Sequence, residues 1–223
     1  MRTAFHRQLD ALTQSIADMC DLSGTAMAQA TEALLNTDIV GAEAVISAHP
    51  DFMIRATQAE NDAYSLLLLQ APVATDLREV LGSLQNVADV YRMAALALHV
   101  ADTVRRRHPS PAIPADINGY FAEMGRIAVD LSRTATDVVL SGNPDHAAKL
   151  AHDDDAMDEL HRLLFSLLMG QWSHTVATAV DVTLLSRYFE RFADHAVTVG
   201  QRVIFQATGT HAAQRQVEQQ HTA

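Results

Sequence analysis

Cysteine, glycine, proline and aromatic side chains are all scarce in this chain of 223 residues. The single cysteine, Cys20, excludes an internal disulfide framework and is typical of proteins in a reducing compartment. With 9 Gly, 6 Pro and 5 % aromatic residues, the chain has little of the turn chemistry that a β-sheet protein needs. Together with 48 % hydrophobic residues, this composition predicts an all-α protein.

Positive charge and long hydrophobic runs are also lacking. The formal net charge is −11, which excludes wholesale binding to nucleic acid or to an anionic membrane surface, because like charges repel. No apolar run approaches the roughly 20 residues that a membrane span needs, and the N-terminus carries no charged-then-apolar leader. We therefore expect a cytoplasmic protein without a membrane span, whose acidic surface is compatible with cations.

Apolar residues recur at spacings of three and four along most of the chain, which predicts six long helices. These helices cover approximately residues 3–35, 38–69, 72–107, 115–140, 144–170 and 173–207. Pro50 predicts a kink or a short break in the second helix, because proline removes a backbone donor. Gly142, Asn143 and Pro144 form a strong stop-and-start signal between two helices. The short connections predict antiparallel neighbours.

Residues 108–114 hold three prolines and form the one convincing linker in the sequence. Just before it, Arg105-Arg106-Arg107 closes the third predicted helix, where cations favour the negative end of the helix dipole. We therefore divide the chain into four parts. These are a first three-helix bundle at 1–108, a linker at 109–114, a second three-helix bundle at 115–207 and a frayed tail at 208–223.

The two halves of the sequence match when one is shifted along the other by 99 residues. Identical residues then coincide at Glu60/Glu159, Leu68/Leu167, Leu69/Leu168, Arg92/Arg191, Ala94/Ala193, Ala97/Ala196, Val100/Val199 and Val104/Val203. This internal repeat predicts two copies of an antiparallel three-helix bundle. The copies differ in one respect, because the first half has Tyr91 and Ala95 where the second has Glu190 and Asp194.

Two pairs of carboxylates in the second half are the candidate metal ligands. Asp154 and Asp158 are four residues apart, as are Glu190 and Asp194, so each pair lies on one face of its helix. If the two helices are antiparallel neighbours, all four carboxylates face one spot. Such oxygen ligands suit a divalent cation such as Mg²⁺, Ca²⁺ or Mn²⁺, or an iron cluster. A solvated acidic helix face is the alternative for each pair.

The chain resembles the PhoU family of phosphate-uptake regulators over residues 3–207. The Pro-x-Ala-x-Asp-Leu-Arg segment of that family is matched by Pro72-Val73-Ala74-Thr75-Asp76-Leu77-Arg78. Its Glu-Arg-x-x-Asp signature is matched by Glu190-Arg191-Phe192-Ala193-Asp194. The first half keeps only Arg92 of that signature, and the second half lacks the segment with proline.

The resemblance implies a fold of two three-helix bundles side by side and a cytoplasmic, homodimeric regulator. Family members generally act with the phosphate ABC transporter, through its cytoplasmic subunits, and with a phosphate-sensing histidine kinase. They repress phosphate uptake and starvation signalling when phosphate is plentiful. Some members bind multinuclear metal clusters through Glu/Asp-x-x-x-Asp pairs.

Arg92 and Arg191 are matched across the repeat, although the carboxylates beside them are not. We expect both arginines to make structural contacts between helices, with Asp89 or Asp76 as the partner in the first half. Asp76 and Arg78 of the family segment join them as candidates for structural or anion-pairing contacts. Pairing of Arg191 with a neighbouring carboxylate or with a phosphate-like anion stays open.

The sequence is compatible with three alternative functions. The first is a regulatory adaptor that works by binding partners. The second is a ferritin-like di-metal enzyme, which needs repeated Glu-x-x-His motifs, whereas the chain offers Asp158-x-x-His161 once. The third is a purely structural helical scaffold with solvated acidic faces. Because the sequence shows no catalytic motif and no Gly-rich phosphate loop, we predict that the protein is not an enzyme.

Overall fold

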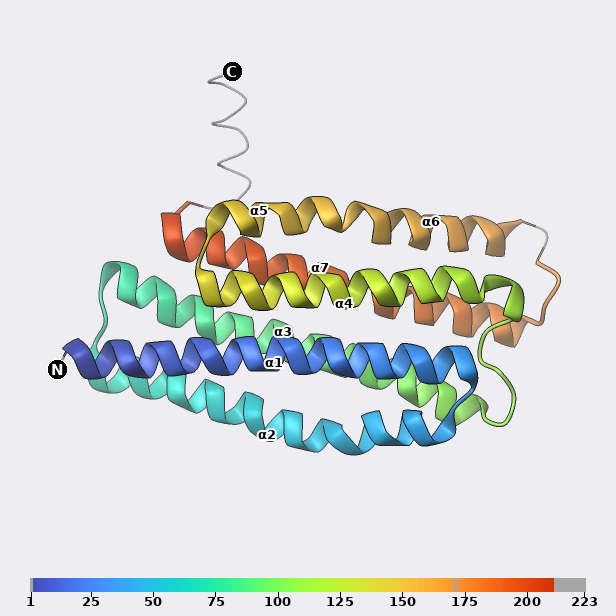
Figure 1. Cartoon of the computed structure of the whole chain (residues 1–223), viewed down its shortest axis with the longest axis horizontal. Helices are drawn as coiled ribbons and strands as arrows, with labels where there is room; N and C mark the ends of the chain where they lie inside the picture. Colours follow the sequence, from blue (N-terminus) through green and yellow to red (C-terminus); the bar gives the residue numbers. More distant parts are fainter. Residues whose placement is uncertain (1, 171, 211–223) are drawn as a thin grey trace, which may run out of the picture.

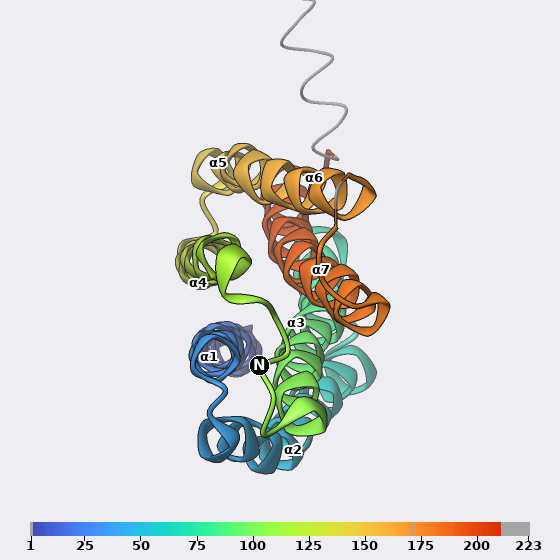
Figure 2. The same ribbon diagram turned by 90° about the vertical axis from the view of Figure 1, so that its right-hand side faces the viewer.

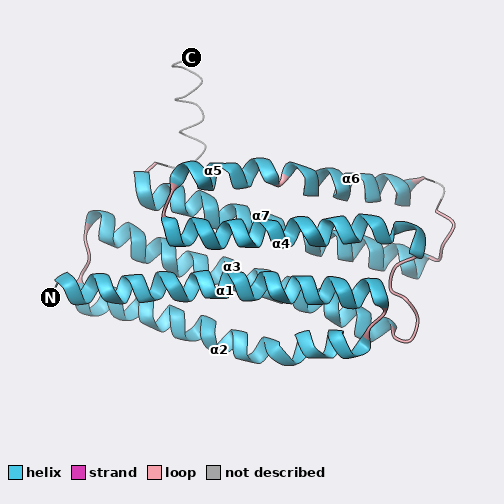
Figure 3. Cartoon of the chain, in the orientation of Figure 1, coloured by secondary structure: helices cyan, strands magenta, loops and turns pink. Residues whose placement is uncertain are grey.

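The computed structural model describes residues 2–170 and 172–210, and every regular element in those ranges is helical (Figure 3). The elements are α1 (Arg2–Asn36), α2 (Ile39–Gln70), α3 (Ala74–Arg107), the 3-10 turn η1 (Ala115–Ile117), α4 (Asn118–Ser141), α5 (Pro144–Asp153), α6 (Asp155–Met169) and α7 (Val176–Thr208). The all-α prediction is confirmed. Among the described helices, none combines the length and the hydropathy that crossing a membrane requires.

The helices form two stacked three-helix bundles, as the repeat predicts. Figure 1 shows α1–α3 in the lower part of the molecule and α4–α7 in the upper part. Where they meet, α1 packs against α4 and α3 packs against α7 (Figure 2). The second pair is antiparallel, since Arg107 lies near Ala177 whereas Asp89 lies near Arg202. The buried apolar side chains of both bundles form one continuous core.

Helix ends follow local sequence chemistry at the predicted turns. Asn143 caps α5 through its side-chain oxygen, which accepts from the backbone N–H groups of Asp145 at 2.9 Å and His146 at 3.2 Å. Gly142 ends α4 with a φ of 61°, a backbone conformation that glycine adopts without strain. Asp38 caps α2 in the same way by accepting from Val40 N–H at 2.9 Å.

The structure differs from the prediction within two helices. Of the two alternatives predicted at Pro50, the short break is wrong, because α2 continues through this exposed residue, while the kink stays a prediction. The predicted helix at 144–170 is divided at Asp154 into α5 and α6, within a run of three Asp residues whose helix propensity is low. Of the predicted tail at 208–223, Thr208 still belongs to α7, and residues 211–223 lie outside the described residues.

The repeat has two registers in the structure. Buried positions of α3 and α7 match at a separation of 99, for example Val90 with Phe189. Buried or partly buried positions of α2 and α6 match instead at 101: Ala56/Met157, Ala59/Leu160, Ala63/Leu164 and Leu67/Leu168. The predicted equivalences Glu60/Glu159, Leu68/Leu167 and Leu69/Leu168 are therefore wrong. Between equivalent positions of these helices the second half has two residues fewer than the first, so a single shift of 99 residues cannot align both helices of each half.

Glycine allows α1 and α4 to approach closely at the junction between the bundles. A Cβ added to Gly24 would lie 2.7 Å from Ser132 Oγ, and a Cβ on Gly125 would collide with the Thr31 side chain. Ser132 Oγ also donates across the junction to Cys20 O at 2.7 Å. Gly24, which the sequence presents only as a weak point in a helix, thus has a packing role.

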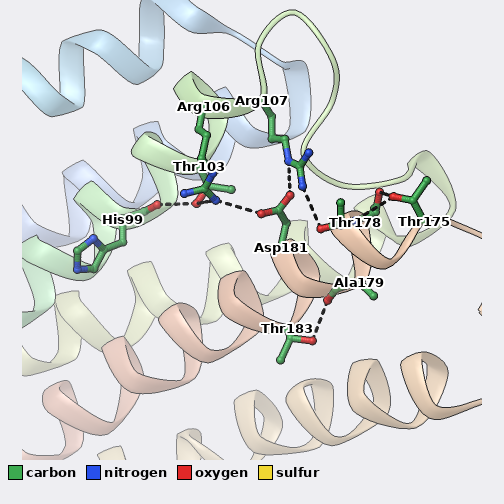
Figure 4. A network of polar contacts seen from close by, with 10 residues as sticks. His99, Thr103, Arg106, Arg107, Thr175, Thr178, Ala179, Asp181 and Thr183 are labelled. Carbon is green, nitrogen blue, oxygen red and sulfur yellow. Dashed lines mark hydrogen bonds and ion pairs between the residues drawn. The ribbon is translucent and has the colours of Figure 1, made fainter.

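Ion pairs to a buried carboxylate fix α3 against α7. Asp181 has a side chain only 4 % exposed and accepts from Arg106 Nη2 at 3.0 Å and from Arg107 (Figure 4). Arg107 Nη2 also donates to Ala177 O at 3.0 Å. These two arginines therefore do more than complement the helix dipole, as the sequence predicts, because they neutralise a carboxylate of the other bundle.

A second polar junction lies further along the same two helices. Asp89 accepts from Arg202 and from His195 Nδ1, which lies 2.7 Å away. Arg202 Nη1 also donates to Asn86 Oδ1 at 3.1 Å. These contacts lower the pKa of Asp89 against the effect of its burial, so the charged form is stable at this junction.

Candidate functional site

Four carboxylates gather where the α5–α6 junction faces α7. Asp154 lies between the two short helices, and Asp158 follows one turn later on α6. Glu190 and Asp194 occupy successive turns of α7. The charges of the other three carboxylates all act on Asp154, so the structure brings the four predicted residues together.

A hydrogen bond beside this cluster fixes α6 against α7. His161 Nδ1 lies 2.9 Å from the hydroxyl of Ser186, and the neighbouring Arg187 bonds to Glu190 Oε1. Burial and the charge of Arg187 lower the pKa of His161, while Asp158 acts in the opposite direction. His161 is therefore held as a neutral hydrogen-bonding group at the edge of the cluster.

The carboxylates destabilise one another's charged forms. Burial, followed by the charges of Asp158, Asp194, Glu190 and Asp155, raises the pKa of Asp154 to about 7. Burial and the charge of Asp194 raise the pKa of Glu190, although Arg187 partly offsets them. Repulsion between like charges at a half-buried site is the physical cause in both cases. A cation bound among these groups would offset the repulsion and lower the pKa of both carboxyls.

Two carboxylate oxygens in the cluster have no hydrogen-bond partner in the described part of the chain. They are Asp154 Oδ1 and Glu190 Oε2, and both are buried. An unsatisfied buried polar atom costs roughly 1–3 kcal/mol, and more when it is charged. Oxygen ligands of this kind suit Mg²⁺, Ca²⁺, Mn²⁺ or iron, so the donor chemistry fits a cation.

The coordination geometry is not preformed. Within residues 2–170 and 172–210, no three His, Cys, Asp or Glu side chains are arranged around a single metal position. Asp154 and Glu190 supply buried oxygens, whereas Asp158 and Asp194 are exposed. Their side chains would have to turn toward the buried pair to complete a coordination shell.

The first bundle carries no equivalent of this cluster. The repeat registers place Met53 and Thr57 of α2 at the positions of Asp154 and Asp158. They place Tyr91 and Ala95 of α3 at the positions of Glu190 and Asp194. The ring of Tyr91 packs instead against His49, with ring centroids 5.9 Å apart. The chemistry of the candidate site is therefore confined to the second bundle.

The predicted ion pairs of the two matched arginines with protein carboxylates do not form among the described residues, and pairing of Arg191 with a phosphate-like anion stays a prediction. Arg92 is exposed and has no ion pair among the described residues, since Asp89 pairs with Arg202 instead. Arg191 is exposed too, and its charge lowers the pKa of Glu190 only weakly. The reason is helical phase: both arginines point outward, whereas the bundle junction lies on another side of α3 and α7.

The remaining predicted residues lie near the first turn of α3. Burial and, after it, the charge of Asp76 raise the pKa of Glu79, and the charges of His6 and Arg78 partly offset them. Arg78 Nη2 donates to Thr75 Oγ1 at 3.2 Å, and Arg78 Nε is buried without a hydrogen-bond partner among the described residues. These groups are distant in sequence from the carboxylate cluster and belong to a separate region.

Sequence reasoning missed Arg187 and the junction residue Asp181. Arg187 stands three residues before Glu190, a spacing at which ion pairs form on a helix, and this signal was available. Asp181 is flanked by Val180 and Val182 at the start of a helix, which marks it as a carboxylate near an apolar face. Its partners are more than 70 residues away, so no local pattern identifies them.

Comparison with protein families and known sequences gives a consistent result. A family model described as the PhoU domain matches residues 16–104 and 121–203. The phosphate-specific transport system accessory protein PhoU homolog 2 of Mycobacterium tuberculosis is 59 % identical over 210 residues, covering 94 % of this chain and 99 % of that protein. PhoU homolog 1 of Mycobacterium leprae is 57 % identical over 211 residues, covering 94 % and 95 %.

Two solved structures share the fold. The phosphate transport system regulatory protein PhoU from Streptococcus pneumoniae aligns with a TM-score of 0.84 at 20 % identity, covering 93 % of this chain and 99 % of that one. PhoU from Pseudomonas aeruginosa aligns with a TM-score of 0.81 at 20 % identity, covering 92 % and 100 %. The sequence matches and the shared helical architecture agree: the chain belongs to the PhoU family.

Proposed function

We propose that this protein is a regulatory adaptor that represses phosphate uptake and phosphate-starvation signalling when phosphate is plentiful. It acts by binding cytoplasmic subunits of the phosphate ABC transporter and the phosphate-sensing histidine kinase. The observation that carries this proposal is the 59 % identity, over 94 % of the chain, to an accessory protein of a phosphate-specific transport system. The proposed setting is the cytoplasm, and the proposed assembly is a homodimer.

Binding, rather than catalysis, is the activity we infer. The pairing of His161 with Ser186 resembles a nucleophile and its base, but Ser186 is 2 % exposed and donates to Thr183 O at 3.3 Å. A hydroxyl held in this way does not reach a substrate. A ferritin-like di-metal enzyme requires ligands from repeated helices, and the first bundle offers Met53 and Tyr91 at two of those positions.

We further propose that the carboxylate cluster of the second bundle holds a cation. Asp154 and Glu190 would supply buried oxygens, and Asp158 and Asp194 would complete the shell. The two buried oxygens without partners support this, as does the raised pKa of Asp154. A divalent cation or iron cluster would supply positive charge that links the α5–α6 junction to α7. The residues themselves orient the ligand oxygens and fix the separation of the helices.

Deletion of the gene in its own host tests the regulatory proposal. We expect starvation genes to be expressed in high phosphate, and repression to return when the wild-type gene is restored. Mycobacterium tuberculosis carries proteins named PhoU homolog 1 and homolog 2, so any second homologue in the host has to be deleted as well. Starvation genes that stay repressed in the strain without homologues would contradict the proposal.

A further inference from the structure

Large apolar side chains are exposed at two places on the outer surface formed by α2, α3, α7 and α6. The first apolar patch consists of Tyr64 and Leu68 of α2 with Leu77 and Leu81 of α3, which are between 36 % and 82 % exposed. The second apolar patch consists of Phe165 and Met169 of α6 with Val176 and Val180 of α7, which are between 51 % and 81 % exposed.

The two patches occupy equivalent positions of the repeat. Tyr64 corresponds to Phe165 and Leu68 to Met169 in the register of α2 and α6. Leu77 corresponds to Val176 and Leu81 to Val180 in the register of α3 and α7. Core packing explains apolar residues at matched buried positions, but it gives no reason for apolar residues at matched exposed ones. Gathered exposed apolar side chains of this kind mark interaction sites.

Both patches lie on one face of the molecule. α3 and α7 are antiparallel neighbours in the middle of this face, with α2 beside α3 and α6 beside α7. The bond from His161 to Ser186 marks the side of α6 that faces α7, and Phe165 and Met169 continue that line at steps of four. The end of α2 and the start of α3 lie at one end of the molecule, whereas the end of α6 and the start of α7 lie at the other (Figure 1). The patches therefore lie at opposite ends of this face, because the equivalent helices α3 and α7 run antiparallel.

One matched arginine stands between the patches in each half. Arg92 follows Leu81 by eleven residues, and Arg191 follows Val180 by the same number, which is three helical turns along one face. Both arginines are exposed, and Arg92 makes no ion pair within the described ranges. The repeat thus keeps an apolar patch and an arginine in both copies, although it keeps the carboxylate cluster in only one.

We propose that this face binds a two-fold symmetric protein that presents the same apolar element twice, each copy flanked by a carboxylate. A standard interface places roughly 20–30 residues on each side, so one patch of four side chains is too small to act alone. A homodimeric partner supplies two equal elements for the two patches. A carboxylate on each element complements Arg92 or Arg191, which sets the orientation of docking.

This inference rests on the proposed function for the choice of partner. Among the proposed partners, the face suits one whose cytoplasmic portion is itself a dimer. The first probe is the purified cytoplasmic portion of the phosphate-sensing histidine kinase from the same host, prepared as a dimer. The purified cytoplasmic subunits of the phosphate transporter serve as a second probe.

The test is isothermal titration of each probe with the full chain and with patch variants. One variant carries Leu77→Ser and Leu81→Ser, a second carries Val176→Ser and Val180→Ser, and a third carries all four changes. Because two linked contacts gain affinity over one, either pair of changes should weaken binding by about 100-fold or more, and all four should abolish it. We expect one chain for every two probe subunits. Circular dichroism checks that each variant remains folded.

A matched control carries Val40→Ser, since Val40 is 75 % exposed on α2 but lies outside both patches. It should bind as tightly as the wild type. Wild-type binding that survives all four patch changes would overturn the docking face and leave the proposed function intact. Loss caused by one patch but not by the other would overturn the two-fold symmetry. A wild-type chain that binds neither probe would contradict the proposed function itself.

Other occupants of the face give distinct results. If the patch changes dissociate the chain's own oligomer in light scattering without affecting kinase binding, the face is a contact between copies of this chain. If deleting residues 211–223 raises amide hydrogen exchange around Leu77 and Leu81, the C-terminal segment is the occupant. Either result would overturn the proposal.

Discussion

Asp154→Asn is expected to stabilise the metal-free protein at pH 8 and to have a smaller effect at pH 5. The carboxyl of Asp154 has a folded-state pKa of about 7, whereas an aspartate in an unfolded chain titrates near 3.9. Between these values the folded state binds more protons than the unfolded state. The unfolding free energy therefore falls as pH rises from about 4 to about 7, and it is constant above that range. Asparagine removes this dependence because it does not ionise.

The size of the stabilisation by Asp154→Asn follows from the same pKa. The difference between the folded-state and unfolded-state pKa of Asp154 corresponds to an upper limit of about 4 kcal/mol, at 1.36 kcal/mol for each pKa unit. Asp154 is only partly buried, so solvent screening reduces this figure, and we expect a gain of about 2 kcal/mol at pH 8. At pH 5 we expect a gain of less than about 1 kcal/mol. At that pH only the interval from about 4 to 5, in which the folded state binds more protons than the unfolded state, has lowered the stability of the wild type.

Thermal unfolding in the presence of a chelator measures this difference. For a chain of this size, about 2 kcal/mol raises Tm by roughly 4–8 °C. Asp153→Asn is the matched control, since Asp153 is exposed, and it should leave Tm nearly unchanged at both pH values. With saturating Mn²⁺ the order should reverse, because only the wild type gains full binding energy. An Asp154→Asn variant that is no more stable at pH 8 than the wild type would show that the folded protein does not raise the pKa of Asp154.

Two further outcomes follow from the site and the bundle junction. Replacing Glu190 and Asp194 with Ala should remove most of the metal measured by plasma mass spectrometry, whereas Tyr91→Ala should retain it; equal metal content in both variants would exclude the second-bundle site. Gly125→Ala should lower the unfolding free energy by about 1–3 kcal/mol in urea titration, because the new Cβ meets Thr31. Gly119→Ala, with open space at its Cβ, should cost nothing, so equal losses would contradict the close approach of α1 and α4.

Local chemistry made the helices predictable, because a cap or a turn depends on adjacent residues. The ends of α4 and α5 follow from Gly142 and Asn143, and the structure confirms them. At Pro50 only the short break is excluded, since α2 continues through it; whether a proline ends a helix depends on the packing around the whole helix, which adjacent residues do not give. The break at Asp154 was not predicted, because no glycine or proline marks it in the sequence.

The carboxylate cluster was predictable because its members come in pairs four residues apart on two helices that must be neighbours. What the sequence did not supply was the helical phase. The pairing of Asp89 with Arg202 rather than with Arg92 depends on which side of α3 faces α7. Likewise, the identical residues Leu68 and Leu167 suggested a wrong register between α2 and α6. Equivalent positions in these two helices are those that share burial, and they need not share residue identity.

Repression of phosphate uptake by this protein is tested by the rate of uptake in a strain that lacks this gene and any second homologue. Cells grown in high phosphate are supplied with radiolabelled phosphate, and the initial rate of uptake is compared with that of the parent strain. We expect uptake to rise in the deletion strain and to return to the parental rate when the wild-type gene is restored. An unchanged rate of uptake in the deletion strain would contradict the proposed repression.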